Sequence, residues 1–174
     1  MELDLRWPLF FFANLLLIAL LRLVNDTVSL YGFYFCLPGL LTLLPALHVP
    51  PRWGIPLCLA TALFYAAPYS EKIAPFLVVY GLGYVIFRQF SSQLRRFRRF
   101  QLLTALAAAN TLLILIQSAL LSPEVGILPY MQRVMVDAML SAILIYPVGS
   151  WFIDLQYGAM QLFGTDPRAD APPQ

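Results

Sequence analysis

Few side chains in this sequence have the types and spacing that catalysis or metal binding requires. His48 is the single histidine among 174 residues, and no cysteine or carboxylate lies at ligand spacing from it, whereas a zinc site needs several such ligands together. An aspartyl dyad needs two carboxylates face to face, but Asp137 and Asp154 lie in one predicted helix, about 25 Å apart at 1.5 Å per residue. Ser150 is far along the chain from His48, its one candidate base. We therefore expect no enzyme activity, no metal and no cofactor.

The polar residues that most need an explanation lie inside apolar stretches. Asn110 and Gln117 are seven residues apart, hence on one face of a predicted helix, and Asn14 in the first apolar stretch is their candidate partner. Such groups are costly in lipid and are candidates for function. The three amides predict either a polar cluster that lines a ligand pocket or hydrogen bonds that join helices, and we favour the second interpretation. Arg133 and Asp137, four residues apart, are expected to form a structural ion pair.

The segment from Phe87 to Phe100 carries five arginines. Drawn as a helix, it separates basic from apolar side chains. The basic side holds Arg88, Arg95, Arg96 and Arg99, the apolar side holds Phe87, Phe90, Leu94 and Phe97, and Arg98 lies off the basic face. This pattern predicts a basic amphipathic helix at the cytoplasmic surface, in contact with anionic lipid. The alternative is a docking site for a cytosolic partner.

The elements that hold these residues are expected to be membrane helices. Of the residues, 60% are hydrophobic and 11% are charged, against about 45–50% and about 25% in a soluble domain. So few charges cannot cover the surface of a soluble domain, and we expect lipid to cover most of it. The formal net charge of +2 gives no reason to expect a nucleic-acid partner.

Apolar runs bounded by charges, prolines and glycines predict an all-α bundle of six transmembrane helices. The runs cover residues 8–24, 31–47, 54–69, 73–90, 101–121 and 134–153. The third run has sixteen residues and reaches about 24 Å, short of the roughly 30 Å hydrocarbon core, so a re-entrant segment is the alternative there. Residues 1–164 are expected to form a single transmembrane domain, and the proline-rich tail 165–174 is expected to be disordered.

The distribution of Lys and Arg indicates the orientation, because these residues accumulate in short cytoplasmic loops. With six spans and both termini in the cytoplasm, eight of the 11 basic residues lie inside, and Arg22, Lys72 and Arg133 lie outside. If the third run does not span, the better orientation leaves seven inside and four outside. The first arrangement has the stronger bias, so we expect the N- and C-termini to be cytoplasmic.

Four stretches within this small six-span layout suggest a family. They are Leu20-Leu21-Arg22, residues 37–41 (LPGLL), residues 76–84 (FLVVYGLGY) before the arginines, and residues 142–147 (AILIYP) in the last helix. Together they resemble the rod shape-determining protein MreD family of bacteria. The resemblance implies a non-catalytic subunit of the cell-elongation complex, which acts in lateral peptidoglycan synthesis at the cytoplasmic (inner) membrane. It also implies partners: the bitopic scaffold MreC, bound through transmembrane helices, with MreB and the RodA polymerase with its transpeptidase.

The same resemblance supplies a rival function, because the MreD family is similar in fold to the substrate-binding subunits of energy-coupling-factor vitamin transporters. Those subunits typically present an Ala-x-x-x-Ala surface on the first helix to the coupling subunit. Here Ala13 and Ala19 are six residues apart, and the run Phe10-Phe11-Phe12 offers bulky packing instead. An unrelated membrane scaffold is the third alternative.

Overall fold

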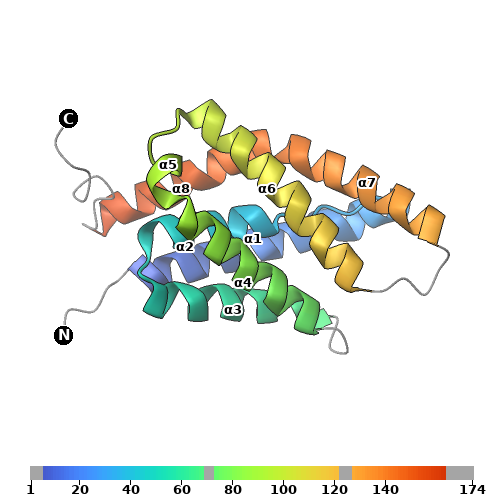
Figure 1. Cartoon of the computed structure of the whole chain (residues 1–174), viewed down its shortest axis with the longest axis horizontal. Coiled ribbons are helices and arrows are strands. Elements are labelled where there is room, and N and C mark those ends of the chain that lie inside the picture. The colour runs from blue at the N-terminus through green and yellow to red at the C-terminus, as the bar shows by residue number, and fades with distance from the viewer. Residues whose placement is uncertain (1–5, 69–72, 122–126, 164–174) are drawn as a thin grey trace.

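The computed structural model is all-helical over the residues that it describes, which are 6–68, 73–121 and 127–163 (Figure 1). Its elements in chain order are α1 (Arg6–Val28), the 3₁₀ turn η1 (Ser29–Tyr31), α2 (Pro38–His48), α3 (Pro51–Ala66), α4 (Ile73–Gln89), α5 (Ser91–Leu94), α6 (Arg99–Leu120), α7 (Ile127–Leu144), the π turn η3 (Ile145–Gly149) and α8 (Ser150–Leu162). The predicted tail 165–174 lies outside the described residues.

Within the described ranges, three helical stretches are long and apolar enough to cross a membrane. They are Arg6–Tyr31, Arg99–Leu120 and Ile127–Leu162, whereas α2 and α4 are shorter apolar helices. At 1.5 Å per residue, the 11 residues of α2 reach about 16 Å, well below the roughly 30 Å hydrocarbon core. The chain therefore has the all-helical build of a membrane protein, with three helices of full spanning length.

The predicted helix at 31–47 is wrong in its first half. The chain leaves η1 at Gly32, whose positive φ of 82° suits a glycine, and becomes helical again at Pro38. Pro38 disfavours a helical conformation at Leu37 and, as the first residue of α2, has no intrahelical use for an N–H, so it favours a helix start at this point. We call residues 32–37, which lead into α2, the entry segment.

The arginine segment is not the single amphipathic helix that the pattern predicts. After α4 the chain forms the one-turn helix α5, turns at residues 95–97, and begins α6 at Arg99. Arg98 has an extended backbone (φ −64°, ψ 154°), and its N–H donates to the Gln101 side chain at 3.0 Å. This cap marks the start of α6, whereas the pattern predicted that one helix would continue from Phe87 to Phe100. We call residues 88–99 the arginine corner.

The last predicted helix, 134–153, is longer in the structure. The elements α7, η3 and α8 form one continuous helix over Ile127–Leu162. Pro147 lacks the N–H that an α-helix would use, and the wider π turn accommodates it without ending the helix. The helices α1, α3, α4 and α6 overlap their predicted runs, with ends moved by up to four residues.

Helix α2 lies at the centre of the packing, in contact with α1, α3, α4 and α6. All of its residues except His48 are buried. The helices alternate in direction along the long axis of the molecule (Figure 1). The start of α1, the α2–α3 connection, the arginine corner and the end of α8 consequently lie at one end of the molecule, and the end of α1 and the start of α7 lie at the other (Figure 1).

Candidate functional site

The entry segment has a non-helical backbone that runs from exposed residues 32 and 33 to the buried Cys36 and Leu37, so the N–H and C=O groups of its inner part need partners from other elements. The first partner is Asn25 on α1, which is 3% exposed. Its Nδ2 donates to the Phe35 carbonyl at 2.9 Å, and its Oδ1 accepts the Phe35 N–H at 2.8 Å. Both polar atoms of the amide are thus used by one residue of the entry segment.

Helix α7 supplies two further acceptors, one turn apart. The Tyr34 N–H donates to Asp137 Oδ1 at 2.9 Å, and the Cys36 N–H donates to Ser141 Oγ at 3.0 Å. Asp137 also forms the ion pair with Arg133, whose Nε lies 3.9 Å from Oδ2. The partly buried carboxylate of Asp137 therefore has a cation on its own helix and a backbone N–H from the entry segment, which lowers the cost of burying its charge.

Helix α6 holds the junction between the entry segment and α2. The side chain of Asn110 donates from Nδ2 to the Cys36 carbonyl at 3.1 Å and accepts the Gly39 N–H on Oδ1 at 2.9 Å. A Cβ on Gly39 would lie 3.1 Å from Cα and Cβ of Asn110, so glycine permits this close approach. Gln117, two turns along α6, accepts from the Cys36 thiol at 3.9 Å.

Asn14 on α1 contacts the body of α2. Its Nδ2 donates to the Leu41 carbonyl at 2.9 Å and lies 3.3 Å from Thr61 Oγ1 on α3. In a regular helix the Leu41 carbonyl would accept the N–H of residue 45, but that residue is Pro45 and has none. Asn14 therefore replaces a hydrogen bond that the proline removes, while its own Oδ1 has no hydrogen-bond partner among the described residues.

The structure thus brings Asn110 and Gln117 together at Cys36 and places Asn14 beside the next turn of α2. All three amides bond to groups of the protein itself. Sequence reasoning missed Ser141 and also Asn25, which lies between the predicted runs 8–24 and 31–47. The spacing of four residues between Asp137 and Ser141 was the signal that could have placed both on one face of α7.

Two residues of the arginine corner bind the C-terminal end of α2. Arg88 Nη1 donates to the Ala46 carbonyl at 3.2 Å, and Arg95 donates to the Leu47 carbonyl. The last carbonyls of a helix lack intrahelical partners and carry partial negative charge, so cations stabilise them. Both arginines are therefore engaged in holding the central helix.

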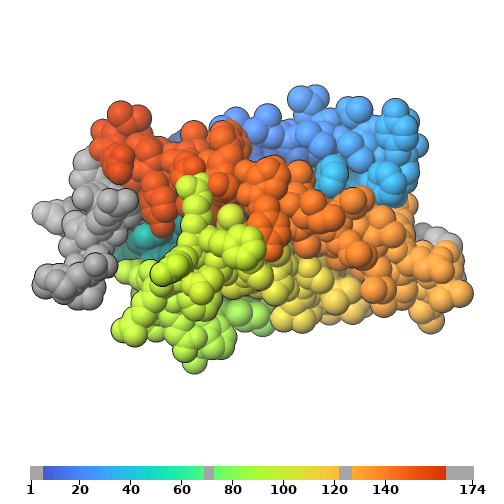
Figure 2. All heavy atoms as spheres, turned by 90° about the horizontal axis from the view of Figure 1, so that it is seen from above, coloured from blue at the N-terminus to red at the C-terminus, as the bar shows by residue number. Residues whose placement is uncertain are grey.

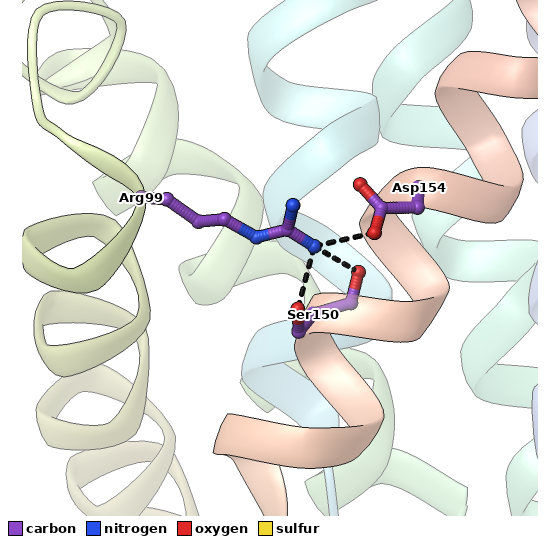
Figure 3. Close-up of polar contacts among 3 residues, drawn as sticks. All are labelled: Arg99, Ser150 and Asp154. Atoms are coloured by element: carbon purple, nitrogen blue, oxygen red, sulfur yellow. Dashed lines mark hydrogen bonds and ion pairs between the residues drawn. The ribbon is translucent and has the colours of Figure 1, made fainter.

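A third arginine links α6 to α8 at the surface. Arg99 Nη2 donates to the Ser150 carbonyl at 2.9 Å, to Ser150 Oγ at 2.5 Å and to Asp154 Oδ2 at 2.5 Å (Figure 3). The side chains of Arg99 and Asp154 are 52% and 60% exposed, so the pair itself adds about 0–1 kcal/mol of stability. Its role is to fix the start of α6 against α8.

Arg96 and Arg98 differ from the other three arginines of the corner. Both are exposed, and within the described part of the chain neither guanidinium has a hydrogen bond or ion pair. They are the arginines of the corner whose side chains remain available to another molecule. The described residues also hold no group of three or more His, Cys, Asp or Glu side chains that could bind a metal.

Comparisons with known proteins do not assign this arrangement to a family. A scan against family models finds no matching family, and searches of curated proteins and of solved structures find no match.

Proposed function

We propose that the chain is a non-catalytic subunit of a membrane complex, with six crossings of the bacterial inner membrane and both termini in the cytoplasm. The entry segment supports this topology. Its six non-helical residues can span at most about 20 Å and α2 adds about 16 Å, so the two together can cross a roughly 30 Å hydrocarbon core. The arginine corner lies at the same end of the molecule as the start of α1 and the end of α8 (Figure 1), as the excess of basic residues in cytoplasmic loops requires.

The proposal of a non-catalytic role rests on what the buried polar side chains of the helices bind. Asn14, Asn25 and Asn110 bond to backbone groups of the entry segment and α2. Both polar atoms of Asn25 and of Asn110 are used in this way and stabilise the fold, and Asn14 Oδ1 is the one polar atom of these three amides without a partner among the described residues. The apolar side chains that remain exposed are suited to contact lipid or the helices of other membrane proteins.

The partners follow from the resemblance to the MreD family. On this proposal the chain binds an MreC-like bitopic protein through its transmembrane helices. It then acts with MreB and the RodA polymerase with its transpeptidase during cell elongation and lateral peptidoglycan synthesis.

One observation favours a second candidate, the substrate-binding subunit of an energy-coupling-factor vitamin transporter. An extended segment that leads into a buried half-helix is an arrangement that transporters use to bind solutes. The entry segment followed by α2 has this form, although its Phe35 and Cys36 backbone groups are already bonded. An unrelated membrane scaffold is the remaining alternative.

Affinity purification from native membranes tests the proposal. The full chain carries a C-terminal tag, is extracted in mild detergent, and its co-purifying proteins are quantified by mass spectrometry. A control bait is an unrelated six-span protein with the same tag and a similar expression level. We expect enrichment of an MreC-like protein or the RodA synthase over the control. Enrichment of a coupling subunit with paired ATPases would overturn the proposal in favour of vitamin uptake.

A further inference from the structure

An apolar groove lies under the arginine corner, between α4, α5 and α6. Its volume is about 270 Å³. The apolar lining includes Ile86, Phe90, Leu94, Phe97, Ala105 and Ala109. Ala105 and Ala109 are one turn apart on α6, and their small side chains leave the room that the groove occupies. Phe90 and Phe97 are 50% and 41% exposed, so the groove is open to the surroundings of the protein.

Two exposed arginines adjoin a residue that lines this groove. Arg96 and Arg98 flank Phe97 in the sequence, are exposed, and have no side-chain partner within the described residues. Arg88, Arg95 and Arg99 are bound elsewhere in the protein. In the space-filling view the corner, in yellow-green, stands at the surface beside α8 (Figure 2). An apolar groove is thus combined with two unpaired cations at one end of the bundle.

We propose that this groove binds one anionic glycerophospholipid, with an acyl chain against Phe90 and Phe97 and the headgroup phosphate on Arg96 and Arg98. Charge complementarity selects an anionic lipid, because guanidinium groups bind phosphate oxygens well and no choline cation neutralises the phosphate of phosphatidylglycerol. The size selects a single chain, since the volume lies below the roughly 300–1,000 Å³ of a site for a complete drug-sized ligand. The inference is independent of the protein partner proposed above and needs no other protein for its test.

Lipid binding to the purified full-length protein tests the inference. The protein is delipidated in detergent and titrated with phosphatidylglycerol or with phosphatidylcholine of the same acyl chains, and bound lipid is counted by native mass spectrometry. We expect one phosphatidylglycerol per chain at concentrations where phosphatidylcholine does not bind. Equal binding of the two lipids would overturn the proposal.

Paired variants separate the two halves of the site. Arg96→Gln and Arg98→Gln should each weaken phosphatidylglycerol binding about fivefold, whereas Arg52→Gln should change it less than about twofold because Arg52 lies against Trp53.

Ala109→Leu fills the groove and should weaken binding about tenfold or more. Ala108→Leu on the adjacent exposed position adds the same bulk outside the groove and should leave binding unchanged. Equal effects of the two alanine variants would contradict the assignment.

A measurement on the unmodified protein guards against a variant that fails to fold. Phosphatidylglycerol with a photoreactive group in one acyl chain is cross-linked to the wild-type chain, and the labelled peptides are identified. Labelling concentrated in residues 86–109 supports the site. Labelling spread over the exposed faces of α1 and α7, with no excess in this range, would exclude it.

Discussion

Asn110 makes the two hydrogen bonds at the start of α2, to the Gly39 N–H and the Cys36 carbonyl. Replacing it with alanine leaves both buried backbone groups without partners, and each unsatisfied group costs about 1–3 kcal/mol. We expect Asn110→Ala to lower the free energy of unfolding by about 2 kcal/mol or more. Equilibrium unfolding in mixed detergent micelles measures this change.

The neighbouring Thr111 provides the matched control for that variant. Its hydroxyl donates to the Ala107 carbonyl of its own helix at 3.0 Å, a bond that no other element needs. Thr111→Ala should therefore change the free energy of unfolding by less than about 0.5 kcal/mol. Losses of the same size in both variants would show that Asn110 has no special role in holding the entry segment.

At the residue scale, sequence alone located the polar positions better than their partners. Asn14, Asn110 and Gln117 are conspicuous because apolar residues surround them, and the interpretation as hydrogen-bonding groups follows from the cost of leaving an amide unpaired in lipid. Their partners were not predictable, since these are mostly backbone groups of residues 36–41. The sequence does not show which backbone groups need a side-chain partner unless the non-helical segment before α2 is already known.

Helix α2 is short and contains Pro45, and its stability should depend on Asn14 for this reason. In wild type, Asn14→Ala leaves the Leu41 carbonyl without its donor. With Pro45→Ala, the new N–H of residue 45 can donate to that carbonyl. We therefore expect Asn14→Ala to cost about 1 kcal/mol less in the Pro45→Ala background than in wild type. A double-mutant cycle of unfolding free energies measures this coupling.

Helix α3 offers a parallel cycle as the control. Pro56 also lies inside a helix, but the carbonyl that it leaves free, at Arg52, has no contact with Asn14. The effects of Asn14→Ala and Pro56→Ala should therefore add within about 0.5 kcal/mol. Coupling of similar size in both cycles would contradict the account of Pro45, because it would reflect general loosening of the bundle.

At the scale of elements, hydrophobic runs predicted where helices occur but not where they break. The apolar run at 31–47 predicts one helix, although Pro38 disfavours a helical conformation at Leu37 and the helix begins only at Pro38. At Pro147 the predicted helix 134–153 does continue, because a π turn keeps α7 and α8 continuous. In the arginine corner the amphipathic pattern predicted one helix, but the Arg98 N–H donates to the Gln101 side chain and a new helix begins at Arg99. Each outcome depends on a tertiary or capping contact that periodicity does not contain.

The whole molecule is an alternating helical bundle in which the arginine corner and the end of α2 meet. Arg95 donates to the Leu47 carbonyl, so the α2–α3 connection and the corner must lie on the same side of any membrane. In the six-crossing arrangement that side is the cytoplasm, and Ser29 at the far end of α1 lies outside. If only the three longest helices crossed, the chain between α1 and α6 would stay on one side, with Ser29 and the corner together.

The most direct test of the six-crossing arrangement is to determine, in intact cells, on which side of the membrane single added cysteines lie. Ser29→Cys, Arg52→Cys and Ser92→Cys lie at exposed or partly exposed positions, whereas the native Cys36 and Cys58 are buried. We expect a membrane-impermeant maleimide to label position 29 in intact cells, and positions 52 and 92 only after the membrane is opened. Labelling of positions 29 and 92 together in intact cells would contradict the six-crossing account.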